Sequence, residues 1–148
     1  MILVSACLAG SACRYDGGKK SNARVAHLVQ SGEAACFCPE CAGKLPIPRE
    51  PSEILGGTGE DVLLGRARVV SRNGEDVTAQ FLRGAYLTLR FCREHGIQKA
   101  ILKARSPSCG CGAIYDGAFT GTLRSGDGVA CAMLKRAGIE VLTEEDLT

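Results

Sequence analysis

Cysteine is the residue type whose number and spacing most clearly suit chemistry in this sequence. The chain has 148 residues and nine cysteines, although a chain of this length can bury a core without disulfides. Five of them stand in distinctive settings: Cys7, the pair Cys38-Pro-Glu-Cys41 and the pair Cys109-Gly-Cys111. Cysteine ligands without histidine beside them are typical of sites for zinc, copper(I) or iron-sulfur clusters. The sequence therefore predicts a thiolate site that binds a metal.

These thiols could bind metal in two ways. Cys38, Cys41, Cys109 and Cys111 together could form a structural zinc site, which takes four ligands at close paired spacing. A cluster held by three cysteines would instead leave one iron open to a substrate, because catalytic metal sites keep an open position. The first arrangement predicts a non-catalytic zinc-binding module, and the second predicts an enzyme.

The elements that must position these thiols alternate between β-rich and helical patterns. Strands are expected within residues 1–7, 34–39, 99–104 and 139–143. Helices are expected within residues 21–32, 76–96 and 126–138. This rhythm is typical of an α/β protein with a three-layer α/β/α arrangement and a mostly parallel, Rossmann-like sheet. We expect residues 1–148 to form a single domain, because no linker divides the chain.

The helix within residues 76–96 has the clearest pattern. Asp76 is its expected N-cap and Gly96 its expected C′ residue. Its apolar face recurs every three or four residues and consists of Val77, Phe81, Ala85, Leu89 and Cys92. A hairpin is expected within residues 62–77, where Asn73-Gly74 is a turn signal.

Three of the distinctive cysteines fall at the carboxyl ends of predicted strands. Cys7 ends the first strand, Cys38 ends the second, and Cys109 lies in the loop after the third. The carboxyl ends of parallel strands share one edge of the sheet, where open α/β folds bind their ligands. We therefore expect the three thiols to converge there, with Cys109 as an exposed thiol in an open loop. Cys36 and Cys131, like Cys92, are expected to be buried packing residues, because a free cysteine behaves as a small hydrophobe.

Composition narrows the choice of partners. The net charge of +2 and the absence of a block of like charges argue against a nucleic acid duplex as a partner. The first residues, Met1-Ile-Leu-Val-Ser-Ala, contain no basic segment, and their apolar run is too short for a signal peptide or a membrane span. We expect the protein to be cytoplasmic, because thiols stay reduced in the cytoplasm and clustered cysteines there more often bind metal or take part in chemistry.

Four segments of the chain resemble one known family. They are SACLAGSACRYDGG (5–18), CPECAGKLPIPREPSEI (38–54), LKARSPSCGCGAIYDGAFTGTL (102–123) and GDGVACAMLKRAGIEV (126–141). In this order they resemble the motif blocks of a bacterial family known as domain of unknown function 523, whose characterised members are thiouracil desulfidases. The resemblance covers nearly the whole chain.

The resemblance implies a cofactor and a reaction. It implies a [4Fe-4S] cluster ligated by Cys7, Cys38 and Cys109, while Cys13 also matches a recurrent cysteine of the family. The reaction implied is the hydrolytic, non-redox removal of sulfur from a thiolated pyrimidine, with the small-molecule substrate and the iron-sulfur assembly machinery as partners. Cys41 and Cys111 depart from the family's pattern.

The resemblance also implies two catalytic side chains. Glu40 matches a catalytic glutamate and is expected to be the general acid/base, and Ser106 is placed to bind the pyrimidine or orient the water. Each residue also has an ordinary structural interpretation. Glu40 could simply favour a helix N-terminus, and Ser106 could be a turn residue ahead of Pro107.

Overall fold

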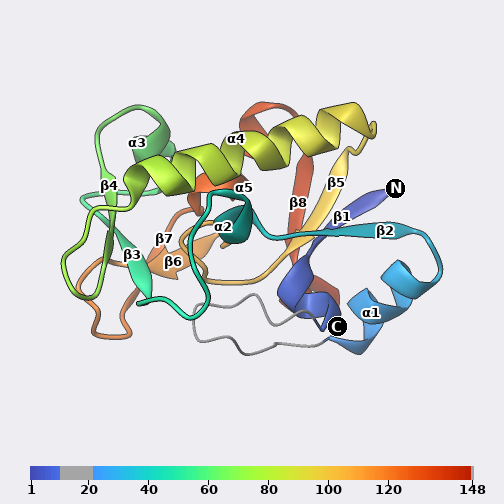
Figure 1. The fold of residues 1–148 in the computed structure, drawn as a ribbon, viewed down its shortest axis with the longest axis horizontal. Helices are drawn as coiled ribbons and strands as arrows, with labels where there is room; N and C mark the ends of the chain where they lie inside the picture. Colours follow the sequence, from blue (N-terminus) through green and yellow to red (C-terminus); the bar gives the residue numbers. More distant parts are fainter. Residues whose placement is uncertain (11–21, 148) are drawn as a thin grey trace.

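A four-stranded parallel sheet is the main sheet of the protein in the computed structural model, which describes residues 1–10 and 22–147 (Figure 1). Its strands, over these described residues, are β1 (Ile2–Ser5), β2 (Ala34–Phe37), β5 (Lys99–Leu102) and β8 (Glu140–Thr143). They lie in the order β2-β1-β5-β8, and each neighbouring pair is parallel. The sheet confirms the parallel arrangement that the sequence predicts, and it aligns the carboxyl ends of all these strands along one edge.

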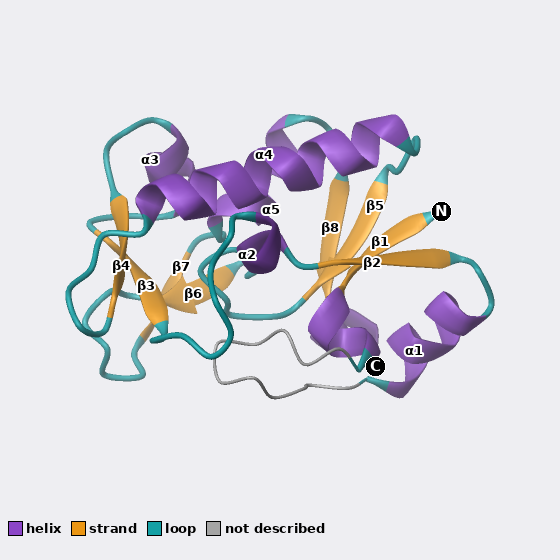
Figure 2. Ribbon diagram, in the orientation of Figure 1, coloured by secondary structure: helices purple, strands orange, loops and turns teal. Residues whose placement is uncertain are grey.

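Helices cover both faces of this sheet, as the three-layer prediction requires (Figure 2). On one face, α4 (Thr78–Glu94) and α5 (Val129–Arg136) pack on Leu3, Ala100 and Leu102. On the other face, α1 (Ala23–Gln30) and the 3-10 helix η1 (Ala6–Ala9) pack on Val4 and Ile101. Because successive residues of a strand point to opposite faces, each of these strands supplies both cores.

The helix predicted within residues 76–96 is α4, and its apolar face is buried as expected. The helix starts at Thr78 with Val77 as its N-cap, so Asp76 is not the N-cap. Asp76 still stabilises this end, because its Oδ1 accepts a hydrogen bond from the Thr78 backbone N at 2.9 Å. Gly96 follows the helix with φ of 63°, a left-handed conformation that glycine adopts without strain.

The short helix α2 (Pro39–Ala42) packs directly on α4 through two glycines. A Cβ atom on Gly84 would lie 2.0 Å from the carbonyl oxygen of Pro39, and one on Gly43 would lie 2.1 Å from that of Gln80. Neither position can accept a side chain at these distances. The close contact fixes α2, and with it Cys38 and Glu40, against the long helix.

Two small antiparallel sheets lie beside the central one in the part of the chain that the structure describes. They are β3 (Ser52–Leu55) with β4 (Arg68–Ser71), and β6 (Ala113–Tyr115) with β7 (Leu123–Ser125). The hairpin predicted within residues 62–77 is present in its second part, because the backbone N of Ser71 donates to the Glu75 carbonyl at 2.8 Å and that of Val77 donates to the Val69 carbonyl at 2.9 Å. Residues 62 and 63 belong instead to α3 (Gly59–Leu63), and β4 also pairs with the upstream strand β3, which contributes Ile54 to a second apolar core. The turn at Asn73-Gly74 is present, with Gly74 at φ of 87°.

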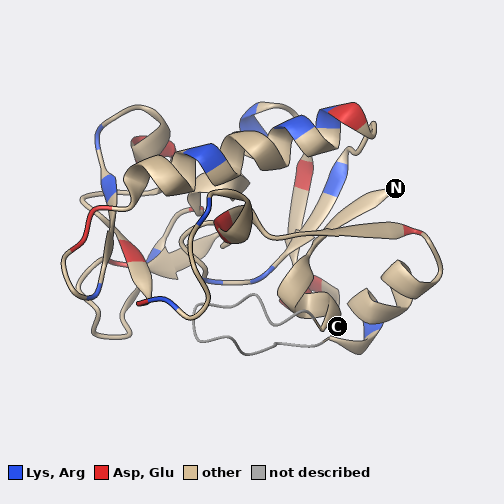
Figure 3. Cartoon of the chain, in the orientation of Figure 1, with Lys and Arg blue, Asp and Glu red and all other residues tan. Residues whose placement is uncertain are grey.

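Charged residues of both signs are scattered along the chain rather than gathered in one block (Figure 3). On α4, for example, Arg90 and Glu94 form an exposed ion pair at 2.8 Å. A short 3-10 helix, η2 (Glu144–Leu147), places three acidic residues after β8. Among residues 1–10 and 22–147, no helix is both long and apolar enough to cross a membrane.

Candidate functional site

A cavity of about 700 Å³ opens at the carboxyl edge of the central sheet. Its wall includes the five residues that the family resemblance implies for the cluster and for catalysis: Cys7, Cys38, Glu40, Ser106 and Cys109. They come from segments that follow β1, β2 and β5, whose carboxyl ends are adjacent in the sheet. The parallel order of these strands therefore explains why residues so far apart in sequence meet at one cavity.

The first two cysteines directly follow their strands. Cys7 lies in η1, two residues beyond the end of β1, and is buried. Cys38 is the N-cap of α2, and its Sγ accepts a hydrogen bond from the backbone N of Cys41 at 3.5 Å. Pro39 is well suited to the position after this cap because its fixed φ favours the first turn of a helix. Cys13, the other candidate for the first ligand, lies outside the described residues.

Cys109 is buried, so the prediction of an exposed loop thiol is wrong. Its side chain is only 5% exposed and belongs to the core between the sheet and α5. The Ser106 hydroxyl explains the inward turn, because its Oγ accepts hydrogen bonds from the backbone N of Ser108 at 3.1 Å and of Cys109 at 3.0 Å. Burial raises the pKa of the Cys109 thiol to about 12, although hydrogen bonds from Ser5 and Ser108 oppose the shift.

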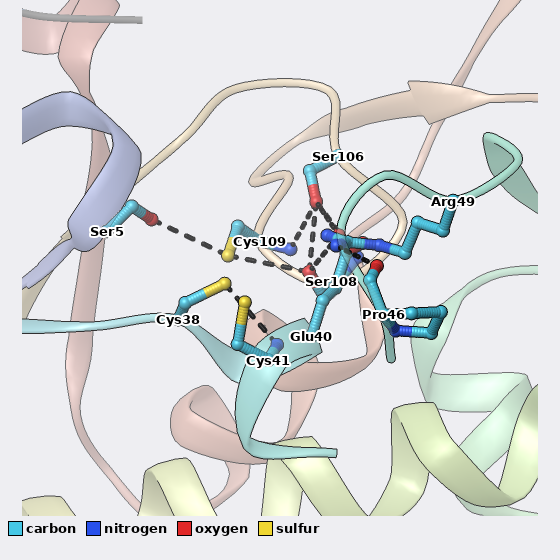
Figure 4. Close-up of polar contacts among 9 residues, drawn as sticks. All are labelled: Ser5, Cys38, Glu40, Cys41, Pro46, Arg49, Ser106, Ser108 and Cys109. Carbon is cyan, nitrogen blue, oxygen red and sulfur yellow. Dashed lines mark hydrogen bonds and ion pairs between the residues drawn. The ribbon is translucent and has the colours of Figure 1, made fainter. Parts of the chain in front are cut away.

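Those two serines surround the Cys109 sulfur. Ser5 Oγ and Ser108 Oγ each donate to Cys109 Sγ at 3.5 Å (Figure 4). Ser5 Oγ also accepts a hydrogen bond from the backbone N of Lys103 at 2.9 Å. The end of β1 is thereby tied both to the segment after β5 and to the thiol.

Glu40 lies in the first turn of α2 and extends into a polar network rather than into solvent (Figure 4). Its Oε1 accepts from Arg49 Nη2 at 2.8 Å and from Arg49 Nε at 3.2 Å. Its Oε2 accepts from Ser108 Oγ at 3.0 Å and from Ser106 Oγ at 3.4 Å. The side chains of Arg49 and Glu40 are 7% and 17% exposed, so this ion pair is largely shielded from water.

Ser108 connects the carboxylate to the thiol. It is buried, and its Oγ lies within hydrogen-bond distance of Glu40 Oε2, of Cys109 Sγ and of Ser106 Oγ, the last at 3.0 Å. Sequence reasoning missed Ser5, Arg49 and Ser108. Ser108 had a signal, because it is the polar residue between Ser106 and Cys109, whereas Arg49 and Ser5 had none.

Basic residues on the cavity wall are paired with the acids of η2. Lys103 Nζ lies 3.0 Å from Glu144 Oε2, and Arg105 Nη2 lies 2.6 Å from Glu145 Oε2. Glu144 also accepts a hydrogen bond from the backbone N of Ala104 at 2.7 Å. These contacts fix the segment after β5 against the segment after β8.

The four-cysteine zinc site predicted as the alternative is wrong. In the part of the chain that the structure describes, one group of three side chains is close enough to share a metal ion. It consists of Cys111, Asp127 and Cys131, whose ligating atoms all lie within 4.8 Å of one another. Cys38, Cys41 and Cys109 are not part of it. Cys111 has turned away from the cavity, and its thiol donates to the carbonyl oxygen of Val141 at 3.5 Å.

The other cysteines also differ in part from expectation. Cys41 sits beside Cys38 but not on the cavity wall, and desolvation, followed by the nearby Cys38, raises its pKa to about 11. Cys92 and Cys131 are buried as predicted. Cys36 is exposed, because it lies on β2, an edge strand with a neighbour on one side only.

Comparison with known proteins gives a consistent result. The sequence model of the family described as 2-thiouracil desulfurase matches residues 2–146 of this chain. The chain is 48% identical over 147 residues to a protein of Bacillus subtilis (strain 168) described as uncharacterized protein YbbK, covering 99% of this chain and 97% of that protein. It is also similar to a solved structure described as the [4Fe-4S]-dependent thiouracil desulfidase TudS. That comparison has a TM-score of 0.87 and 47% identity, and it covers 99% of this chain and 91% of the other.

Proposed function

Because this chain belongs to the 2-thiouracil desulfurase family, we propose that it is an enzyme that removes the sulfur atom of a thiolated pyrimidine by hydrolysis, using a [4Fe-4S] cluster. One observation carries the proposal: Cys7, Cys38 and Cys109 line the same cavity as a carboxylate and a serine hydroxyl that hydrogen-bond to each other. The similarity to a structure described as [4Fe-4S]-dependent supports the choice of cofactor.

The donor set suits such a cluster. Cys7, Cys38 and Cys109 provide three thiols around one cavity, and iron-sulfur clusters are held by cysteine thiolates. Around a single ion, the sulfur ligands would lie within 4.8 Å of one another. Within the described residues, the sulfurs of these three cysteines are not grouped that closely. A cluster of several irons spreads its ligands farther apart, so this arrangement favours the cluster over one zinc ion.

When bound, the cluster would supply an iron without a protein ligand, a Lewis acid with affinity for the soft sulfur of a thiocarbonyl. The remaining chemistry is a hydrolysis. Water replaces the carbon-sulfur double bond with a carbon-oxygen double bond, and the sulfur leaves as hydrogen sulfide without net electron transfer. Both protons of the water must reach the sulfur, so the reaction needs a group that carries a proton.

Glu40 is the group that we assign to this proton transfer. Its carboxylate lines the cavity, where Arg49 donates to one of its oxygens and Ser108 donates to the other. A carboxylate held in this way can take a proton from the attacking water and return it to the leaving sulfur.

Ser106 is the group that we assign to orienting the water or the pyrimidine. Its oxygen already accepts two backbone hydrogen bonds, and its hydroxyl proton is within reach of Glu40 Oε2 and Ser108 Oγ. The serine is therefore held in a fixed orientation at the cavity wall, as positioning of a substrate requires. Assembly of the cluster requires iron-sulfur assembly machinery as a partner and a compartment that keeps thiols reduced, which supports a cytoplasmic location.

Anaerobic reconstitution with iron and sulfide tests the proposal. We expect the protein to gain the visible absorbance of an iron-sulfur cluster and to release sulfide from 4-thiouracil or 2-thiouracil. Cys109→Ser should lose both properties, whereas Cys36→Ser, which changes an exposed cysteine away from the cavity, should keep both.

Glu40→Gln separates catalysis from assembly. This variant should keep the absorbance of the cluster and lose sulfide release, because the amide cannot carry the proton. Loss of the absorbance in Glu40→Gln would make Glu40 a structural residue. A Cys109→Ser protein that still forms the cluster and turns over would contradict the ligand assignment.

A further inference from the structure

A second group of metal-ligating side chains lies outside the cavity, where the loop after β5 meets the start of α5. Cys111 belongs to the loop, Asp127 precedes the helix and Cys131 lies in its first turn. The Sγ atoms of both cysteines and a carboxylate oxygen of Asp127 all lie within 4.8 Å of one another. None of the three residues lines the cavity that holds Glu40 and Cys109.

The spacing of these atoms suits one metal ion. Three points that are no more than 4.8 Å apart all fit within about 2.8 Å of a common centre, and Zn–S bonds are about 2.3 Å long. Small side-chain rotations therefore suffice to bring the three atoms to bonding distance. Zinc binds both cysteine sulfur and carboxylate oxygen, and three protein ligands leave a fourth position for water.

The backbone around the group is rigid. The backbone N of Gly112 donates to Asp127 Oδ1 at 2.8 Å, so the carboxylate already bridges the loop and the helix. The backbone N of Cys131 donates to the Ser108 carbonyl at 3.1 Å, and that of Gly128 donates to the Gly110 carbonyl at 2.7 Å. A site built on such a framework loses little freedom when it binds an ion.

The charges around the group are also suitable. As metal ligands the two thiolates and the carboxylate carry three negative charges, and Lys135 adds one positive charge. Lys135 Nζ lies 3.1 Å from Asp127 Oδ2, with the lysine side chain 41% exposed. A divalent cation would neutralise two of the three negative charges, and it would compete with Lys135 for the Asp127 carboxylate.

We propose that Cys111, Asp127 and Cys131 form a second metal site that binds one zinc ion. The ion would link the loop that carries Ser106 and Cys109 to the first turn of α5. This site is separate from the three cysteines of the cavity, and its proposal does not depend on the reaction assigned to them. It also gives Cys111 a role as a metal ligand, together with Asp127 and Cys131 rather than with Cys38, Cys41 and Cys109.

Zinc titration of the cluster-loaded protein, prepared without oxygen, tests the site. We expect one zinc ion per chain to remain after desalting, measured by metal analysis, and the thermal unfolding midpoint to rise with zinc. Cys131→Ala should lose the bound zinc and the rise in midpoint. Cys92→Ala is a matched control because Cys92, like Cys131, is fully buried, and it should keep both responses.

Two surface variants keep the test informative if Cys131→Ala fails to fold. Asp127→Asn keeps an oxygen that can accept from Gly112 but removes the charge, so zinc should bind at least about tenfold more weakly. Lys135→Gln removes the cation that competes for Asp127, so zinc should bind about threefold more tightly.

Several results would overturn the proposal. Equal zinc binding by Cys92→Ala and Cys131→Ala would place the ion elsewhere, and unchanged affinity in Asp127→Asn would remove the carboxylate from the site. A cluster-loaded protein that holds no zinc after titration would show that the three side chains do not form a metal site. Sulfide release by the wild-type protein separates these outcomes from any failure of the cavity assignment.

Discussion

Replacing Arg49 with methionine should detach Glu40 from its strongest partner while leaving the cysteines in place. Arg49 makes two contacts to one oxygen of Glu40, at 2.8 and 3.2 Å, and its Nη1 donates to the Pro46 carbonyl at 2.9 Å. Methionine has a similar length but no donor. Among the described residues, Ser108 and Ser106 would remain as hydrogen-bond donors to the carboxylate.

The cost follows from the burial of this ion pair. A hydrogen bond to a charged group contributes roughly 1.5–3 kcal/mol, and breaking a buried ion pair by removing one partner costs roughly 3–5 kcal/mol. Because two serines remain on the carboxylate, we expect the free energy of unfolding to fall by about 2–4 kcal/mol. For a chain of this length that lowers the unfolding midpoint by about 6–12 °C. Displacement of the carboxylate should slow sulfide release by about tenfold to a hundredfold.

The assay compares three proteins at a temperature where all are folded. Each is reconstituted without oxygen and measured for cluster absorbance, sulfide release and unfolding midpoint. Arg49→Met should keep the absorbance, because Arg49 hydrogen-bonds to the Glu40 carboxylate and to the Pro46 carbonyl, and neither of these groups is a cluster ligand. Arg90→Met is the matched control, since its ion pair with Glu94 has the same 2.8 Å distance but side chains 62% and 54% exposed. That control should show no measurable change.

Arg49→Lys adds a graded test. Lysine keeps the charge but not the planar fork of the guanidinium, so this variant should recover part of the stability and less of the turnover. Unchanged turnover in Arg49→Met would refute the idea that Arg49 positions Glu40. An equal loss of stability in Arg49→Met and Arg90→Met would refute the magnitude derived from burial.

Two further predictions concern the framework around the site. Gly84→Ala would place a Cβ 2.0 Å from the Pro39 carbonyl oxygen, so it should push α2 away from α4. We expect it to lower the free energy of unfolding by about 1–3 kcal/mol and to reduce the cluster absorbance after reconstitution. An unchanged free energy of unfolding in urea, compared with the wild type, would show that α2 can shift without loss of stability. In α3, hydrogen bonds from the Thr58 backbone and hydroxyl hold the pKa of the Asp61 carboxyl below its ordinary value of 3.8. The stabilisation that Asp61 adds is therefore present above this value and lost as the pH falls below it. At about pH 7 the free energy of unfolding of Asp61→Asn should be lower than that of the wild type. At about pH 2 the two proteins should have similar free energies of unfolding. A difference that persists at low pH would contradict this linkage.

The local pattern of residues was enough to predict most of the elements. Apolar residues every three or four positions identified α4, and short β-rich runs bounded by glycine or proline identified the four parallel strands. These signals are local, because they depend on which face of one helix or strand is apolar. The meeting of Cys7, Cys38 and Cys109 also followed from sequence, since parallel strands place their carboxyl ends at one edge.

Pairings between distant segments were decided by the tertiary structure. The strand β4 pairs with the upstream strand β3 as well as with the residues after its own turn, and β3 completes an apolar core with α3. Cys36 is exposed and Cys109 is buried, the reverse of expectation, because burial depends on which neighbours cover a residue.

The details of both sites were likewise beyond the sequence. Arg49 and Ser108 reach Glu40 from different segments, and Cys111 lies beside Asp127 and Cys131 instead of Cys38 and Cys41. Residue spacing limits which side chains can share a site, but only the path of the loops determines which of them do. The sequence by itself thus determined the type of fold and the thiols at the sheet edge, whereas the folded chain decided which polar groups and which cysteines stand next to one another.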